Sequence, residues 1–316
     1  MVPERAGAHR GGKGLTLTDL ASGQRIAHEV ERVLRTAEVR GQLPTPVEDI
    51  VAAAGLHRGG DDIFDESVLA RAPRELRDVV RGLSGKVRAM LDRREREVYV
   101  HPEIQIASRR NFQTLHEVGH DILPWQAALA YADDDQRLSW STKIRFEQEA
   151  NQAAAEMLFQ RDLFTTMAAE YGIGFAAVVE LCDGIGASIH SGTRRYAETH
   201  RAPVCALVLD ERPLSKDPLT FRRREAVHSP AWAEQFAPPS VWPTSLREGE
   251  YGFLTEVRRA QFLSPVSGEW SHANLDGESV TLNYELFSNT YRTFALIWMP
   301  QREWLKRRRR LIVSSK

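Results

Sequence analysis

The hydrophobic pattern of the N-terminal part of the chain is mainly helical. From Leu15 to about Arg40, apolar residues recur every three or four positions, which places them on one face of a helix. Thr45-Pro46-Val47-Glu48 has the spacing of a capping box with proline in the first turn. It predicts a short helix that ends at Gly55, and the segment from Ala72 to Arg81 predicts another.

The pattern then changes to a period of two residues. Lys86–Leu91 and Glu97–His101 both alternate between apolar and polar side chains, and the polar run Asp92–Arg96 separates them. Strand-like alternation on both sides of a polar turn is typical of a β-hairpin. The sequence therefore predicts a small antiparallel sheet at this point.

Two helices with small residues in their apolar faces follow the hairpin. In the first, Ser108 is the predicted N-cap and Leu123-Pro124 the predicted end. Its apolar stripe comprises Phe112, Leu115, Val118, Gly119 and Ile122. The second helix, from Ile144 to Leu158, is rich in Ala and Glu and follows a polar segment at 124–142. We expect its alanines to let the two helices approach closely, namely Ala150, Ala154 and Ala155.

The rest of the chain predicts a helical region and then a sheet. Helical segments at 161–170 and 175–182 precede a glycine-containing turn at 184–188 and a helix through Tyr196, which together suggest a helix-turn-helix. Strand candidates then dominate, at 203–209, 220–224, 252–257, 279–286 and 293–299. We expect an α+β protein. Its parts would be a flexible leader (1–14), a mainly helical domain with a small antiparallel sheet (15–160), a helix-turn-helix-like region (161–202) and a mixed, mainly antiparallel C-terminal domain (203–316).

The composition is that of an ordinary soluble protein. A net charge of −1 over 316 residues gives no global field that would favour nucleic acid or membrane surfaces. No apolar run approaches the roughly 20 residues that span a bilayer, and the N-terminus lacks the apolar core of a signal peptide. Cys182 and Cys205 are the only cysteines, so there is no disulfide framework. We expect a cytoplasmic protein without a membrane partner.

The first of the two helices carries a His-Glu-x-x-His pattern. His116 and His120 are four positions apart, so both imidazoles can reach one Zn²⁺ from the same helix face. Glu117 follows the first histidine, and it can act on a water molecule as a general base without taking a coordination site. The alternative is a pair of surface histidines without a metal.

A zinc site of this kind needs a third protein ligand, and the second helix offers three carboxylates. These are Glu147, Glu149 and Glu156. Glu147 and Asn151 share a face, so we expect Glu147 to be the ligand and Asn151 to hydrogen-bond beside it, with Glu149 as the fallback.

These residues carry a resemblance to a known family. The run from Ser108 to His120, followed by Glu147-x-x-x-Asn151 and an Ala-rich stretch, resembles the ImmA/IrrE metallopeptidases, and within them the IrrE-like radiation- and stress-response proteases. The resemblance implies a zincin-like, gluzincin-type catalytic domain with His116, His120 and Glu147 as ligands and Glu117 as the base. It also implies a GAF-like C-terminal sensor domain.

The resemblance further implies a substrate and a cofactor. The substrate would be a helix-turn-helix repressor of the XRE type, whose cleavage releases a stress or mobile-element regulon. The cofactor would be Zn²⁺, with Mn²⁺ as the other candidate. In many zinc peptidases a strand beside the site holds the substrate in extended form, so we take Val98, Tyr99 and Val100 as a candidate substrate strand.

A second function competes with the peptidase. The helix-turn-helix-like region carries Arg194 and Arg195, and basic runs lie at 222–224 and 306–310. Such features are typical of phosphate-backbone binding, although they also occur on solvated helix ends. The alternative is therefore a DNA-binding regulator or sensor whose metal site is structural or vestigial.

Overall fold

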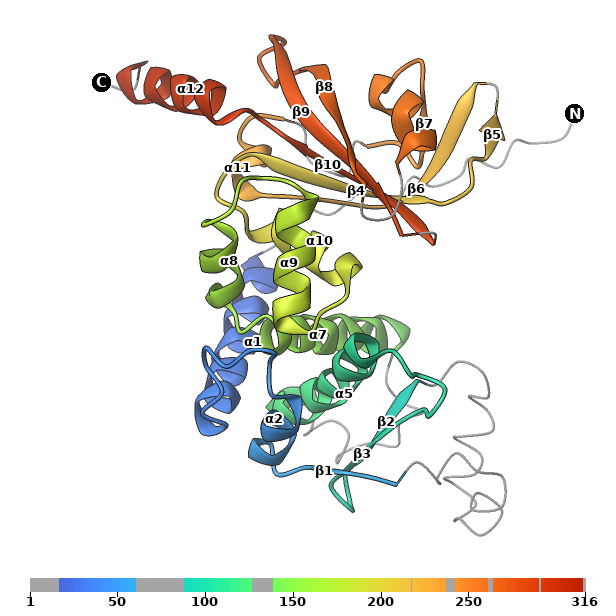
Figure 1. Ribbon diagram of the computed structural model, residues 1–316. Helices are drawn as coiled ribbons and strands as arrows, with labels where there is room; N and C mark the ends of the chain where they lie inside the picture. Colours follow the sequence, from blue (N-terminus) through green and yellow to red (C-terminus); the bar gives the residue numbers. More distant parts are fainter. Residues whose placement is uncertain are drawn as a thin grey trace, which may run out of the picture. The chain divides into compact units, whose positions relative to one another are not determined.

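The computed structural model describes residues 17–60, 88–126, 139–216, 218–236, 242–260, 264–289 and 291–314. The chain divides into two compact units, drawn in Figure 1. One contains Leu17–Met167 and Glu180–Gly192, and the other contains Ala168–Val179 and Thr193–Lys316. The mixed helix and sheet content confirms the α+β class. Residues 161–202 contribute to both units, and the expected helix-turn-helix-like region at 161–202 stays a prediction. The expected leader and the expected helix at 72–81 lie outside the described residues.

Four of the described helices lie entirely in the first unit. They are α1 (Leu17–Thr36), α2 (Val47–Ala53), α5 (Ala107–Ile122) and α7 (Trp140–Leu158). Helices α5 and α7 meet at Gly119, where an added Cβ would lie only 2.9 Å from the carbonyl oxygen of Ala150 and 3.3 Å from the Cβ of Ala153. Small residues therefore allow this close approach, as the sequence predicted.

Two of the predicted helix starts are wrong. Helix α5 begins at Ala107 after Ile106, so Ser108 lies inside its first turn. Helix α2 follows Pro46 and has no side-chain cap. The hydroxyl of buried Thr45 instead donates to the carbonyl oxygen of Leu158 at 2.7 Å. That carbonyl belongs to the last turn of α7 and has no partner within its own helix, which explains why a tertiary contact replaces the local cap.

A three-stranded sheet accompanies these helices. Its order is β1 (His57–Arg58), β3 (Glu97–Val100) and β2 (Ala89–Asp92). Strands β2 and β3 form the predicted antiparallel hairpin, with Ala89 opposite Val100, whereas β1 pairs with β3 in parallel. The tight polar turn of the hairpin ends at Arg96, which has a positive φ of 60°.

A seven-stranded antiparallel sheet dominates the second unit. The main path runs β5-β6-β4-β10-β9-β8, and β7 pairs with β6. The strands are β4 (Val204–Asp210), β5 (Ser215–Lys216), β6 (Leu219–His228), β7 (Ser245–Arg247), β8 (Val266–Ala273), β9 (Ser279–Ser288) and β10 (Arg292–Trp298). The central strands β4 and β10 are almost entirely buried. The short helix α11 (Pro230–Ala233) and the C-terminal helix α12 (Gln301–Ser314) complete the described part.

One predicted strand is wrong. Residues 252–257 lie in a 3₁₀ helix, η3 (Gly252–Arg259). Its buried residues are Phe253, Leu254 and Val257, a spacing that places them on one side of a helix and not on one face of a strand. This short apolar segment is helical and not extended because its buried side chains pack into the core beside the sheet.

Three further helices lie between α7 and β4 in the sequence. They are α8 (Asp162–Ala168), α9 (Phe175–Ile185) and α10 (Ile189–Thr199). Gly186, with a φ of 79°, lies in the turn between α9 and α10, so the predicted helix–turn–helix arrangement is present. Among the described helices, none combines the length and the apolar character that crossing a bilayer requires.

Candidate metal centre

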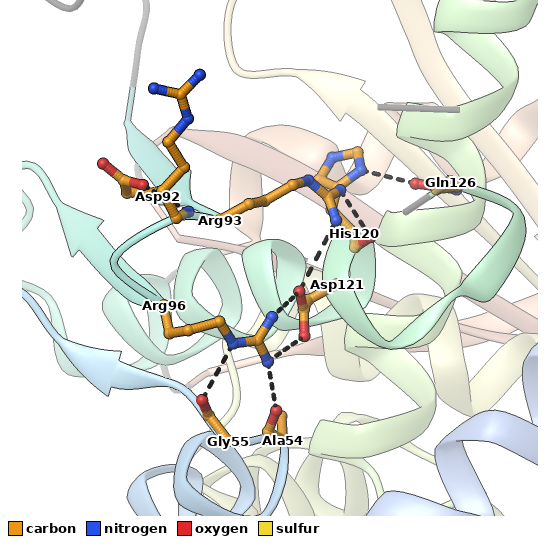
Figure 2. Close-up of polar contacts among 9 residues, drawn as sticks. Ala54, Gly55, Asp92, Arg93, Arg96, His120, Asp121 and Gln126 are labelled. Carbon is orange, nitrogen blue, oxygen red and sulfur yellow. Dashed lines mark hydrogen bonds and ion pairs between the residues drawn. The ribbon is translucent and has the colours of Figure 1, made fainter. Parts of the chain in front are cut away.

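Helix α5 presents the two histidines on one face and is held in place from its C-terminal end. Asp121 accepts two hydrogen bonds from the Arg96 guanidinium, at 2.7 and 2.9 Å. Arg96 also donates to the carbonyl oxygens of Ala54 and Gly55 after α2, as Figure 2 shows. The neighbouring Arg93 donates to the carbonyl oxygen of His120 at 3.0 Å. Hydrogen bonds from the hairpin turn therefore hold in place the end of α5 that carries His120.

Helix α7 brings a carboxylate to the pair. The Nε2 atoms of His116 and His120 lie 3.1 Å apart, and Glu147 approaches them at 3.3 and 3.5 Å respectively. In the described part of the chain, these three residues form a group whose donor atoms are close enough to bind one ion. Of the three carboxylates that the sequence left open, Glu147 is the one that meets the histidines.

These distances fit a tetrahedral metal ion. Two ligand atoms that each lie about 2.0–2.1 Å from a tetrahedral zinc ion are about 3.3 Å apart. The three observed separations, 3.1, 3.3 and 3.5 Å, scatter around that value. The two imidazoles face different oxygens of the Glu147 carboxylate, so the carboxylate can offer either oxygen to an ion. A set of two imidazoles and one carboxylate is one that zinc uses in catalytic sites.

The site shifts the pKa values of its acidic groups in opposite directions. Burial raises the pKa of Glu117, and the charges of His116 and His120 offset only part of that rise. Hydrogen bonds from His116 and His120 lower the pKa of Glu147 well below its usual range, against a smaller opposing effect of burial. Glu147 is therefore an anion at neutral pH, as a ligand requires, whereas Glu117 is more basic than an exposed glutamate.

The pKa of His120 is also shifted. Burial alone would lower it, but the carboxylates of Glu147 and Glu117 and the hydrogen bond to Gln126 raise it above the ordinary value. The imidazole therefore lies in a strongly negative environment, which also favours a bound cation.

A cavity of about 420 Å³ opens beside the three residues. Its lining includes His116, Glu117, His120 and Glu147 from the two helices, Gln113 from α5, and Arg88–Leu91 and Arg93 from the hairpin. The candidate substrate strand differs from the expectation. Val98–Val100 lie in the central strand β3, whereas β2 lines the cavity and is an edge strand among the described residues.

The described residues contain no hydrogen bond between Asn151 and the three site residues, so the role expected of Asn151 stays a prediction. Its side chain is exposed and forms no hydrogen bond with the described residues. Four residues along a helix correspond to a rise of about 6 Å, which carries Asn151 a full turn past Glu147. The hydrogen bond to a histidine comes instead from Gln126, whose Oε1 lies 2.8 Å from Nδ1 of His120, as Figure 2 shows. Gln126 follows α5 in a segment expected to be a polar loop, and no local pattern marked it.

The predicted DNA-binding features are partly neutralised within the second unit. Arg194 forms ion pairs with Glu198 at 2.9 Å and with Glu225 at 3.7 Å. In the basic run of α12, Arg307 pairs with Glu278 at 2.7 Å and with Glu303 at 3.1 Å. Arginines that form ion pairs with carboxylates attract DNA phosphates less strongly than arginines without such a partner. DNA contact by these helices stays a prediction.

Comparisons with known proteins leave the family open. No family model and no curated protein matches the chain. Among solved structures, a Mycobacterium tuberculosis transcriptional regulator superposes with a TM-score of 0.41 and 12% sequence identity, over 87% of this chain and 82% of that chain. Both values are too low for the role of that protein to indicate the role of this one. Membership of the ImmA/IrrE family therefore stays an expectation based on the motif residues.

Proposed function

We propose that the protein is a metal-dependent endopeptidase that acts through His116, Glu117, His120 and Glu147. The observation that carries the proposal is the convergence of two imidazoles and one carboxylate at the separations of tetrahedral ligands. A cavity beside these residues and the raised pKa of the half-buried Glu117 support it. Zn²⁺ is the expected ion, since the donors are two nitrogens and one oxygen, and Mn²⁺ is the second candidate.

The roles of the residues follow from their positions. His116, His120 and Glu147 would hold the ion, which when bound would polarise a peptide carbonyl and lower the pKa of a water molecule. Glu117 would accept a proton from the attacking water molecule and deliver it to the leaving amine. Because burial raises the pKa of Glu117, its carboxylate is a stronger base than an exposed glutamate and releases the proton less readily to solvent.

Strand β2 supplies a place for an extended substrate. The amide of His101 donates to the carbonyl of Arg88, so in this antiparallel pair the hydrogen-bonded positions alternate from Arg88 to Met90. The N–H and C=O groups of Ala89 and Leu91 therefore point away from β3, toward the free edge. A peptide that pairs with these groups would lie along the cavity that β2 lines.

We propose a helix-turn-helix repressor of the XRE type as the substrate, on the strength of the motif resemblance alone. The competing function, a DNA-binding regulator with a vestigial metal site, draws on α9, α10 and the basic run of α12. Its experimental signature is specific DNA binding that persists at physiological salt, which a merely basic surface does not give.

The test combines metal analysis with cleavage. The zinc-loaded protein is incubated with a helix-turn-helix repressor of the XRE type and, for comparison, with casein. We expect the Glu117→Gln variant to retain zinc and lose cleavage, because the substituted side chain is not a metal ligand but can no longer accept a proton. Glu147→Gln is the matched variant, and we expect it to lose zinc as well as cleavage. Proteolysis that survives in Glu117→Gln would refute the assigned base, and purified protein that binds no transition metal would refute the proposed function.

The edge strand has a separate test. Leu91→Pro removes one N–H from the free edge, and proline is tolerated on edge strands. We expect the KM for a peptide substrate to rise while the zinc content stays unchanged. An unchanged KM would exclude substrate pairing at this position.

A further inference from the structure

We propose that Gln126 is a positioning residue that holds His120 in the ring tautomer able to bind a metal ion. The inference deepens the proposed function, because it concerns the same site and rests on that site's holding an ion. It starts from the orientation of one buried amide. The Gln126 side chain is 2% exposed, so protein groups and not solvent decide which way the amide points.

Both hydrogens of the Gln126 amide have acceptors. Its Nε2 lies 3.0 Å from Oε2 of Glu149 and 3.2 Å from the carbonyl oxygen of Phe146. Reversing the amide would place its oxygen against these two acceptors, which would repel it. The opposite end, Oε1, therefore faces Nδ1 of His120 at 2.8 Å.

The orientation of the amide decides the tautomer of the histidine. An amide oxygen only accepts hydrogen bonds, so Nδ1 of His120 must carry a hydrogen. In the neutral imidazole the lone pair then lies on Nε2. That nitrogen is the one that faces His116 and Glu147, so the tautomer set by Gln126 is the one the metal centre needs.

Glu149 fixes the far end of this chain of hydrogen bonds. Glu149 is 6% exposed, and its carboxylate accepts from Gln126 and from three other donors: Ser22 at 2.9 Å, Trp125 at 2.7 Å and Arg145 at 3.0 Å. Four donors converge on this carboxylate, which keeps it in place as the acceptor of the Gln126 amide. Groups on α1 and α7 thus hold Gln126 in one orientation.

The second histidine has no such support. Nδ1 of His116 is buried without a hydrogen-bond partner among the described residues. Packing against its neighbours is therefore what orients His116, and the directional support of the pair comes from Gln126. Removing that support costs roughly 10- to 100-fold in metal affinity where it has been tested in other zinc sites.

The experiment compares Gln126→Leu with Gln113→Leu in the full-length protein. Gln113 lines the same cavity but forms no hydrogen bond with the described residues, so the same chemical change there serves as the matched control. Zinc affinity is measured by competition with a chromophoric chelator. We expect it to fall roughly 10- to 100-fold in Gln126→Leu and to stay near wild type in Gln113→Leu. Equal zinc affinities in wild type and Gln126→Leu would overturn the proposal.

A second measurement on the metal-free protein reports the tautomer directly. Nitrogen-15 spectra of labelled histidine distinguish a protonated Nδ1 from a protonated Nε2, and a purely structural role of Gln126 would not change them. We expect the Nδ1–H form for His120 in the wild type and a shift toward the Nε2–H form in Gln126→Leu. The same tautomer in both proteins would refute the positioning role. A wild type that binds no zinc would refute the proposed function, while these spectra would still decide the role of Gln126.

A double variant that exchanges the side chains of Gln126 and Glu149 provides a second test in case Gln126→Leu does not fold. Gln126→Glu combined with Glu149→Gln keeps one carboxylate and one amide in contact but reverses their order. The carboxylate then accepts from His120, and the amide at position 149 donates to it. We expect zinc affinity to recover part of the loss seen in Gln126→Leu, because the hydrogen bond to His120 is kept whereas the one to the Phe146 carbonyl is replaced by a repulsive contact between two oxygens. Affinity as low as that of Gln126→Leu would show that the hydrogen bond to His120 is not what the site needs.

Discussion

The close approach of α5 and α7 at Gly119 gives the sharpest stability prediction. A methyl group at this position would lie 2.9 Å from the carbonyl oxygen of Ala150, which is backbone and cannot rotate away. Since non-bonded atoms of this size prefer about 3.5 Å or more, Gly119→Ala forces the helices apart by roughly 0.5 Å. Overpacking of this kind costs about 1–3 kcal/mol. Alanine gains about 1 kcal/mol of helix propensity over glycine, so we expect a net loss of roughly 0–2 kcal/mol.

A second helical glycine provides the control. Gly184 lies in α9, and among the described residues no atom outside its own helix lies within 4 Å of the place where a Cβ would be, so Gly184→Ala keeps a propensity gain of up to about 1 kcal/mol. The assay is pulsed hydrogen exchange along a urea titration, read on peptides that cover α5 and α9. We expect the α5 transition to move to lower urea in Gly119→Ala and the α9 transition to higher urea in Gly184→Ala. If Gly119→Ala raised the α5 transition by as much, the contact with Ala150 would not limit the helix separation.

Three further predictions concern other parts of the chain. The Glu285 carboxylate accepts a hydrogen bond from the first amide of α9, Phe175 N–H, at 2.6 Å. We therefore expect Glu285→Ala to lower the free energy of unfolding, measured in urea, by about 1 kcal/mol, and Glu285→Gln to lower it less. Burial raises the pKa of Cys182 to about 12 and that of Cys205 further, so neither thiol should react with Ellman's reagent until urea unfolds the protein. Burial lowers the pKa of His272, which stacks on Trp270. The contribution of the neutral His272 imidazole to stability is therefore full above about pH 6.5 and is lost as the pH falls through its folded-state pKa. His272→Phe should flatten that part of the pH–stability curve, and an unchanged curve would exclude His272 as its cause.

Features that depend on local spacing could be predicted from the amino-acid sequence. His116 and His120 share a helix face because they are four residues apart, and no tertiary contact is needed to bring them together. The alternation on either side of residues 92–96 likewise determined the hairpin, and the buried pattern of β4 determined a central strand. The small residues of α5 and α7 also indicated that the two helices pack closely.

The way in which distant segments complete the site depends on tertiary packing and could not be predicted from local patterns. Glu147 and Glu149 are both glutamates of one helix, but positions two apart point about 200° away from each other around the axis. The packing of α7 therefore sends Glu147 to the histidines and Glu149 to a buried network with Ser22, Trp125 and Gln126. The hydrogen bond from His120 to Gln126 arises in the same way. So does the contact of Thr45 with the Leu158 carbonyl, which takes the place of a side-chain cap on α2. Each depends on polar groups of different segments finding partners as water is excluded, and a single sequence does not encode that pairing in its local pattern.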